Sequence, residues 1–236
     1  MIMYKNKKIL VIIPARGGSK GIKNKNITNV CNKPLVAYTI GPALRIKKDR
    51  LVDEVIVSTD SRKIADIAQR LGAHVPFLRP KKISGDKAKP IDFVVHAINH
   101  FEKKGIFYDC VVILQPTSPL RKYKDIKEAI KLYLKNKNES LISAYCEDEI
   151  DETELYHKEK NFGIPLSFNH NKGIRRQELK NIFVRDGTIY ISSVKHIKKC
   201  HRIISNTPLL FEISKNRALD IDTQKDLKTL RKTLCE

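Results

Sequence analysis

A glycine-rich basic segment follows the first apolar run of the chain. Pro14–Asn26 reads PARGGSKGIKNKN, and its cations include Arg16, Lys20 and Lys25. Glycines let backbone N–H groups approach an anion closely, and the cations can neutralise several negative charges. The segment therefore predicts a phosphate-binding loop that would suit a triphosphate, although a basic surface turn is the simpler alternative. It is neither a GxxxxGK[ST] nor a GxGxxG loop, so hydride transfer loses its usual support.

A second segment, Gln115–Arg121, combines an amide and two hydroxyls with two prolines in the order QPTSPLR. The prolines fix a rigid turn around these polar side chains. Gln115 could hydrogen-bond a ribose or a base. A proline-rich loop that caps the next helix explains the segment equally well, so the segment alone does not decide a function.

Two carboxylates stand near the end of the chain in the sequence Leu219–Asp222. Alternation in an extended segment puts Asp220 and Asp222 on one face. Two carboxylates combined with phosphates and water make an ordinary Mg²⁺ site. The alternative is that Asp222 caps the helix that follows it.

Two other polar segments carry weaker signals. Ser58–Ser61, STDS, offers Asp60 or Ser61 as a helix cap. Arg175–Gln177 places two arginines side by side, which could bind a carboxylate bidentately, although surface arginines are common.

The periodicity of the chain predicts the elements that position these residues. Ile9–Ile13, Val55–Val57 and Val111–Leu114 are short apolar runs, typical of strands buried on both faces. Amphipathic helical spacing lies between them, at 64–71, 94–101 and 126–134. This alternation predicts an α/β fold with three layers and a mainly parallel sheet. Ligands of such sheets bind beyond the carboxyl ends of the strands, where the polar segments lie.

The alternation stops after Cys146. An acidic stretch followed by Gly, Pro and Asn residues occupies 147–182, which we interpret as an excursion with short strands inserted in a single domain, 1–236. The pattern resumes at Thr188–Ile191 and Leu209–Ile213, and a final helix carries Leu227, Leu230 and Leu234.

Composition bounds the location and the partners. The chain has 236 residues and a formal net charge of +20, but its lysines are dispersed and no aromatic-interleaved RNA motif occurs. A basic, solvated surface that attracts nucleotides is favoured over a nucleic-acid-binding module. No apolar run is long enough to span a membrane. Five scattered cysteines without zinc-ligand spacing favour unpaired thiols in a reducing cytoplasm.

Together these segments resemble the acylneuraminate cytidylyltransferases, the CMP-sialic acid synthetase family. The stretches that carry the resemblance are IPARGGSKGIKNKNI, KPLVAYTI, VSTDS, RPKKISGD, LQPTSPLR, RRQE…DGTIYI and ALDIDTQKD, in family order over nearly the whole chain. The resemblance implies a Rossmann-like nucleotide-transferase fold. It also implies a homodimer formed through the excursion, with CTP, an acidic nine-carbon sugar and Mg²⁺, or Mn²⁺ in its place.

The resemblance also implies roles for single residues. The nucleotide-binding residues would be Ala15, Arg16, Gly17, Gly18, Ser19, Lys20, Lys25, Asn26, Arg79, Ala88 and Gln115. The sugar-binding residues would be Gln115, Thr117, Ser118, Arg176, Gln177 and Tyr190. Asp220 and Asp222 would bind the metal, and the catalytic residues would be Arg16, Lys25 and Asp222.

The chain departs from the family pattern at three places around the expected base and sugar. Lys87–Pro90 replaces small and hydroxyl residues near the base, Leu179–Lys180 replaces a proline, and Asp186–Thr188 replaces Asn-Gly-Ala. The expected substrate is therefore a relative of sialic acid, such as legionaminic acid. A pseudaminic acid or KDO type of sugar is the alternative, although Gly21–Ile22 and the GGSKG loop are less typical of those branches.

Overall fold

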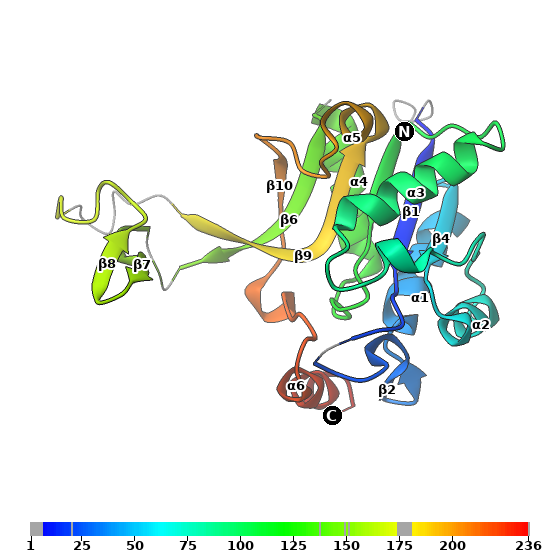
Figure 1. Cartoon of the computed structure of the whole chain (residues 1–236), viewed down its shortest axis with the longest axis horizontal. Helices are drawn as coiled ribbons and strands as arrows, with labels where there is room; N and C mark the ends of the chain where they lie inside the picture. Colours follow the sequence, from blue (N-terminus) through cyan, green and yellow to red (C-terminus); the bar gives the residue numbers. More distant parts are fainter. Residues whose placement is uncertain are drawn as a thin grey trace.

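Within the residues described here, the central sheet has six strands. The computed structural model describes residues 7–19, 21–136, 138–148, 150, 152–173 and 181–235. The strands run in the order β10-β6-β9-β5-β1-β4 (Figure 1). Their bounds are β1 (Ile9–Pro14), β4 (Glu54–Ser58), β5 (Cys110–Ile113), β6 (Ser140–Glu147), β9 (Ile182–Ser193) and β10 (Leu209–Glu212).

The sheet is mainly parallel, as the sequence predicts. β1 pairs in parallel with β4 and β5, and β10 pairs in parallel with β6. β9 runs antiparallel to both of its neighbours, β5 and β6. The predicted strand at Thr188–Ile191 is therefore one part of a longer strand, β9, which runs in the opposite direction to the other strands of the sheet.

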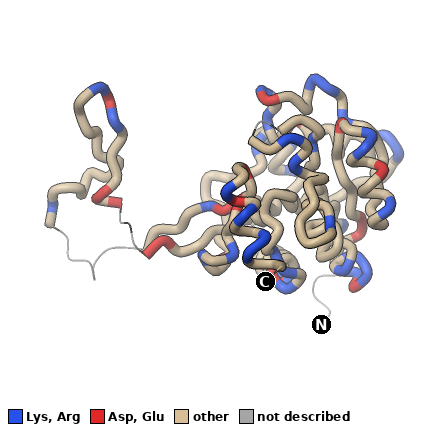
Figure 2. Tube along the Cα trace, turned by 90° about the horizontal axis from the view of Figure 1, so that it is seen from below, with Lys and Arg blue, Asp and Glu red and all other residues tan. Residues whose placement is uncertain are grey.

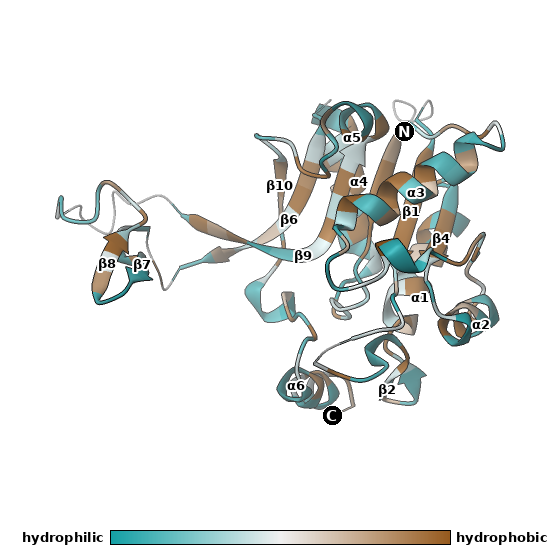
Figure 3. Ribbon diagram, viewed as in Figure 1, coloured by the Kyte–Doolittle hydropathy of each residue, from teal (hydrophilic) through white to brown (hydrophobic). Residues whose placement is uncertain are grey.

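Helices cover both faces of the sheet and complete the predicted three layers. Alternate residues of β1 face opposite sides, because successive side chains of a strand do so. Ile9, Val11 and Ile13 pack with α1 (Ala37–Lys48), α2 (Arg62–Arg70) and α4 (Tyr123–Asn136). Leu10 and Ile12 pack with α3 (Pro90–Glu102) and α5 (Val194–Cys200). Figure 3 shows this hydrophobic colouring concentrated on the central strands and the facing sides of the helices.

The excursion at 147–182 contains a hairpin that stands apart from the body of the molecule. Its strands are β7 (Tyr156–Glu159) and β8 (Phe162–Pro165), which pair antiparallel. The long ends of β6 and β9 lead out to it (Figure 1). Phe162 is 71% exposed and Phe168 is 98% exposed, so this segment does not bury its aromatic side chains within the chain.

The C-terminal helix α6 (Gln224–Cys235) packs beside the hairpin of β2 (Asn29–Val30) and β3 (Lys33–Pro34). Val30, Leu227 and Leu230 share a small buried cluster there. The packing brings together Cys31 and Cys235, which form a disulfide with a Cα–Cα distance of 5.7 Å.

The expectation of unpaired thiols is wrong for these two cysteines. They are 204 residues apart in the sequence, so no local spacing announces the bond. Cys110, Cys146 and Cys200 are free thiols. None of the helices in the described ranges is long and apolar enough to cross a membrane.

Candidate active site

A cavity of about 710 Å³ lies at the carboxyl ends of β1 and β5. This is the edge where the sequence predicts a ligand. The predicted site residues among its lining are Arg16, Ser19, Lys25, Asn26, Arg79, Ala88, Gln115, Thr117, Tyr190 and Asp222. Gly18 lines an adjoining hollow that shares Arg16 and Ser19 with the cavity. Ala15 is fully buried behind the loop. The predicted residues Lys20, Arg176 and Gln177 lie outside the described residues.

Backbone contacts hold the glycine segment at the end of β1. The Ala15 N–H donates to the carbonyl of Ser58 at 2.9 Å, and the Gly17 N–H donates to the Asp60 carboxylate at 2.8 Å. A Cβ atom on Gly21 would lie 2.1 Å from the carbonyl oxygen of Asp222, so no larger residue fits there. The glycine is therefore required because the loop passes directly against the aspartate segment.

Two residues of the segment Ser58–Ser61, Asp60 and Ser61, have different roles. The Ser61 hydroxyl accepts from the Ile64 N–H at 3.4 Å and caps α2, which confirms the cap predicted there. The Asp60 carboxylate accepts the Gly17 N–H instead of capping the helix. Sequence reasoning missed this contact, because it joins two segments that are far apart in the chain.

Arg16 and Asn26 form the next part of the loop. The Arg16 guanidinium pairs with Asp86 at 2.8 Å, and both side chains are partly exposed. Asn26 is buried, and its side-chain amide donates to the Arg16 carbonyl at 2.9 Å. Asn26 thus fixes the backbone of Arg16, while the Arg16 side chain reaches the cavity.

Lys25 joins the glycine segment to the two aspartates. Its ammonium donates to the Ile221 carbonyl and to the Asp222 carboxylate, both at 2.7 Å. Ile221 is fully buried, whereas the aspartates on either side of it are exposed, so the two carboxylates flank one buried residue. The contact between Lys25 and Asp222 places a cation and a carboxylate side by side on the wall of the cavity.

Asp222 does not cap the helix that follows it. The Thr223 hydroxyl accepts the Asp226 N–H at 3.3 Å, and the Asp226 carboxylate accepts the N–H groups of Asp222 and Thr223, at 3.0 and 2.6 Å, so Thr223 and Asp226 together cap the start of α6. This leaves the Asp222 carboxylate directed to Lys25. Although Asp220 is exposed as a residue, partial desolvation of its carboxylate raises its pKa above the usual value, a hydrogen bond from Thr117 lowers it, and the neighbouring charge of Asp222 raises it.

A buried guanidinium supports the turn of QPTSPLR. Arg121 donates to the Gln115 carbonyl at 3.1 and 3.2 Å, to the Thr188 carbonyl at 2.7 Å and to the Thr39 hydroxyl at 2.7 Å. Burial lowers the pKa of Arg121 to about 9, and the charges of Asp186 and Asp125 oppose that shift. Ser118 is also buried and does not line the cavity. Sequence reasoning did not identify this role of Arg121.

Arg79 is a second buried arginine beside the cavity. Its guanidinium donates to the hydroxyl and the carbonyl of Ser58, and it lies 5.1 Å from the ring centre of Phe93. Burial lowers its pKa to about 10, the charge of Asp60 raises it and that of Arg16 lowers it. Arg79 therefore binds the last residue of β4 and also forms part of the cavity wall.

A further part of the cavity wall surrounds Tyr190. Tyr190 lines the cavity together with Gln115, Ile203 and Ile204, and burial raises the pKa of the tyrosine hydroxyl. Arg185 also lines this part, and sequence reasoning missed it. Its one sequence signal is that it directly precedes the Asp186–Gly187 turn.

These features define a nucleotide-binding protein of the α/β class, with cations and carboxylates gathered at the carboxyl edge of a mainly parallel sheet. The sequence model of the cytidylyltransferase family matches residues 10–235. The chain belongs to this family, and it is a nucleotidyltransferase.

Curated relatives carry more specific names. The chain is 34% identical over 229 residues to the CMP-N,N'-diacetyllegionaminic acid synthase of Legionella pneumophila, covering 93% of each chain. It is 33% identical over 221 residues to the pseudaminic acid cytidylyltransferase of Campylobacter jejuni, covering 94% of each. It is 33% identical over 227 residues to the N-acylneuraminate cytidylyltransferase of Escherichia coli, covering 94% of this chain and 51% of that protein.

Solved structures support the fold. The structure of CMP:2-keto-3-deoxy-manno-octonic acid synthetase complexed with CTP aligns with a TM-score of 0.67 at 17% identity, covering 97% of this chain and 98% of that one. A 4-diphosphocytidyl-2C-methyl-D-erythritol synthase aligns with a TM-score of 0.69 at 13% identity, covering 97% and 99%. At these identities the likeness concerns the Rossmann-like cytidylyltransferase fold alone.

Proposed function

We propose that this protein transfers CMP from CTP to the anomeric hydroxyl of a nonulosonic acid and releases pyrophosphate. The observation that carries the proposal is the contact of Lys25 with Asp222 in one part of a cavity whose lining elsewhere includes Gln115 and Tyr190. The first part thus offers charges suited to a triphosphate, and the part around Gln115 and Tyr190 offers neutral polar groups and the Arg185 cation, which suit an acidic sugar. The names of the relatives favour this pair of substrates.

The reaction is an in-line displacement at the α-phosphorus. The oxygen of the anomeric hydroxyl forms the new bond, the bond to the β-phosphate oxygen breaks, and the hydroxyl proton passes to solvent or to a base that we do not assign. Negative charge grows on the leaving pyrophosphate, so electrostatic stabilisation dominates. Arg16 and Lys25 supply positive charge at that end of the cavity. Neither a histidine nor a cysteine is needed as a nucleophile.

Asp220 and Asp222 fit a Mg²⁺ ion, and Mn²⁺ is an acceptable substitute. They offer hard oxygen donors, and their mutual repulsion contributes to the raised pKa of Asp220. Within the described ranges no group of three or more His, Cys, Asp or Glu side chains could hold a metal. Two carboxylates completed by phosphate oxygens are the usual Mg²⁺ arrangement in such sites. When bound, the ion neutralises phosphate charge.

We propose that different parts of the cavity lining select the nucleotide and the sugar. Ala88 lines the cavity and Asp92 accepts the Lys89 N–H at 2.9 Å, so the Lys87–Pro90 stretch shapes its wall. We expect CTP to be used well ahead of UTP, ATP and GTP. We propose a legionaminic type of acid as the sugar, with pseudaminic acid or KDO as the alternative.

One assay tests the proposed function. The protein is incubated with CTP, Mg²⁺ and one acid at a time: N,N'-diacetyllegionaminic acid, pseudaminic acid, N-acetylneuraminic acid or KDO. Pyrophosphate release is measured with each acid, and the four nucleotides are then compared with the best one. No release with any acid overturns the proposal, and equal turnover of UTP and CTP overturns the nucleotide preference.

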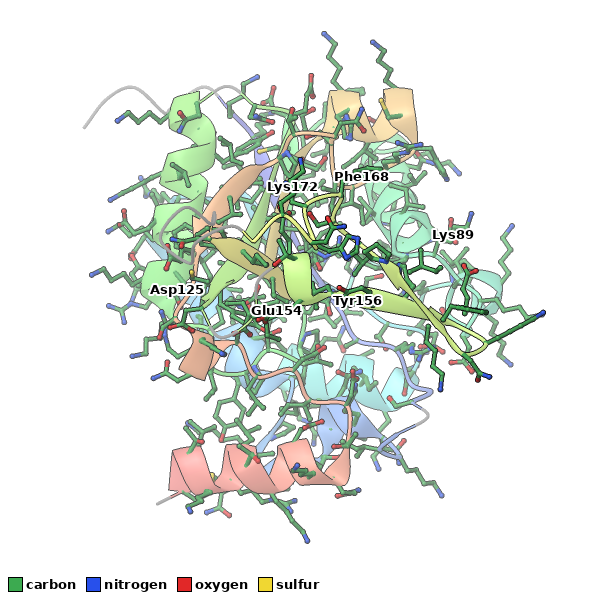
Figure 4. The ribbon with its side chains drawn as sticks, turned by 90° about the vertical axis from the view of Figure 1, so that its left-hand side faces the viewer. Lys89, Asp125, Glu154, Tyr156, Phe168 and Lys172 are labelled. Carbon is green, nitrogen blue, oxygen red and sulfur yellow. A yellow bond between two sulfur atoms is a disulfide. The ribbon has the colours of Figure 1, made fainter. Side chains whose placement is uncertain are left out.

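A homodimer formed through the excursion is part of the proposal. Figure 4 looks at the excursion end-on, with Tyr156 on the hairpin and Phe168 on the segment after it. Tyr156, Phe162 and Phe168 are exposed, and contiguous exposed apolar surface marks an interaction site. A second copy of the chain would cover these side chains.

A nucleic-acid-binding module is the alternative of a different class. Figure 2 shows Lys and Arg along the whole trace, with Asp and Glu among them. Such dispersion favours a basic, solvated surface over a nucleic-acid interface. A gel shift that depends on salt, without pyrophosphate release, would support the alternative. The cytoplasmic location expected from the sequence stays a prediction.

A further inference from the structure

An irregularity in β9 directs a cation into the sugar end of the cavity. Tyr190 pairs with Ile142 of β6, and Arg185 pairs with Ala144. A single residue of β6, Ser143, therefore faces four residues of β9. In a regular strand, residues 185 and 190 would point to opposite faces. The bulge changes this alternation, and both side chains line the same cavity.

The bulge is held in place by buried hydrogen bonds. The Ser143 hydroxyl donates to the Asp186 carboxylate, which also accepts the N–H and the hydroxyl of Thr188. Gly187 has a φ of 78°, a conformation that glycine adopts without strain. Asp186 is 8% exposed, so the residue next to Arg185 is fixed. The position of Arg185 is thus set by the fold rather than by a loop.

Arg185 differs from the cations at the phosphate end of the cavity. Those cations have partners: Arg16 pairs with Asp86, Lys25 pairs with Asp222, and Arg79 donates to Ser58. In the part of the chain that the structure describes, the guanidinium of Arg185 forms no hydrogen bond or ion pair. Its guanidinium carbon lies 6.0 Å from the ring centre of Tyr190. An exposed cation held against an aromatic ring is available to an incoming anion.

The proposed reaction brings two anionic groups to this cavity. The triphosphate matches the cations of the glycine segment. The carboxylate of the acidic sugar needs a cation of its own, and the planar fork of a guanidinium binds a carboxylate in two parallel hydrogen bonds. We propose that Arg185 binds the carboxylate of the sugar, and this inference rests on the proposed function. Arg185 is then a specificity-determining residue that separates acidic from neutral sugars.

The test compares Arg185→Met and Arg185→Lys with the native chain and with Arg202→Met. Arg202 is an exposed arginine that lines a separate hollow, so its loss is a matched change of charge outside the cavity. Steady-state KM values are measured for CTP and for the best acid of the four. The carboxamide analogue of that acid, in which the carboxylate is neutral, is measured as well.

Arg185→Met is expected to raise the KM for the acid by roughly 10- to 100-fold, the range of a lost hydrogen bond to a charged group. The KM for CTP should stay within about twofold, which also shows that the variant is folded. The KM of Arg185→Lys for the acid should lie between those of the native chain and Arg185→Met. Arg202→Met should have the KM values of the native chain. The native chain should prefer the acid to the carboxamide, and Arg185→Met should lose that preference.

The failures are distinguishable. If the native chain releases pyrophosphate and Arg185→Met keeps the native KM for the acid, the assignment of Arg185 is wrong and the proposed function stands. A native chain that is inactive with every acid overturns the proposed function, and the role of Arg185 with it. Loss of CTP affinity in Arg185→Met, with the acid unaffected, would place Arg185 at the nucleotide instead.

Discussion

At the scale of single residues, the two cations proposed for catalysis have different surroundings. Arg16 forms a partly exposed pair with Asp86, whereas Lys25 is largely covered and contacts both a carbonyl and the Asp222 carboxylate. An exposed ion pair contributes at most about 1 kcal/mol to the free energy of unfolding. A substitution of Arg16 should therefore cost little stability, so it distinguishes a catalytic role from a structural one more clearly than a substitution of Lys25 would.

Arg16→Ala should impair chemistry more than folding. A cation beside the leaving pyrophosphate stabilises the transition state more than the bound substrate, so kcat/KM should fall by the equivalent of roughly 2–4 kcal/mol. The melting temperature should change by only a few degrees, because the pair with Asp86 is exposed. Kinetics and thermal melting are compared with Lys131→Ala, which removes an exposed pair with Glu128. A variant that melts much earlier but whose folded fraction works normally would show that Arg16 is structural.

Asp222→Asn should lower kcat by on the order of 10²-fold or more, because metal stabilisation of phosphate charge is worth several kcal/mol. EDTA should abolish the native activity, and Mg²⁺ or Mn²⁺ should restore it. Asp66→Asn is the matched control: it makes the same change at an exposed carboxylate on α2, away from the cavity, and should leave kcat and the metal dependence intact. Near-normal kcat in a folded Asp222→Asn would count against the metal site.

At the scale of elements, a buried arginine joins three parts of the fold. Arg121 comes from the turn before α4, and its partners lie in α1, in the turn after β5 and in β9. It thereby sets the spacing between Gln115 and the strand that carries Tyr190. Because both terminal nitrogens of a rigid, planar fork donate to these acceptors, no other side chain reproduces the arrangement.

Arg121→Met should destabilise the fold by roughly 2–4 kcal/mol, because the carbonyls of Gln115 and Thr188 lose a buried donor. Arg121→Lys should not restore stability, since an ammonium cannot reach all three partners at once. Urea unfolding measures the loss, and the KM for the sugar should rise in both variants. Full stability of Arg121→Lys would show that charge alone, and not the fork, holds the turn.

Elements also show where sequence reasoning works and where it stops. The continuous apolar run Ile9–Ile13 predicts a fully buried strand, and the spacing of Ile64, Ile67 and Ala68 predicts α2, because both signals are local. The direction of β9 is not local, since the same apolar run fits a parallel or an antiparallel neighbour. The partners of Arg121 and the direction of the Arg185 side chain depend on tertiary contacts and a bulge. No pattern within one segment encodes them.

At the scale of the whole molecule, the excursion at 147–182 exposes aromatic side chains that no other part of the described chain buries. Phe162→Ser with Phe168→Ser should shift the protein toward a monomer, because the two rings are the most exposed aromatic side chains in the described residues. Sedimentation at several concentrations measures the mass, and Phe107→Ser, an exposed ring on the main body, is the matched control. An unchanged dimer would place the interface elsewhere, and a native monomer would contradict the dimer proposal.

The bond between Cys31 and Cys235 gives the oxidised chain the form of a ring with a free arm. Nearly all the sheet belongs to the ring, but β1 and the glycine segment lie on the arm, and β1 is held between β4 and β5 by hydrogen bonds and core packing, without a covalent cross-link of its own. A single backbone cut in the projecting hairpin would leave one covalent molecule, while a cut between Lys25 and Cys31 would break the covalent link to the arm that carries Arg16 and Lys25. The reactive segment is thus covalently anchored at its base, next to the helix that follows the aspartates.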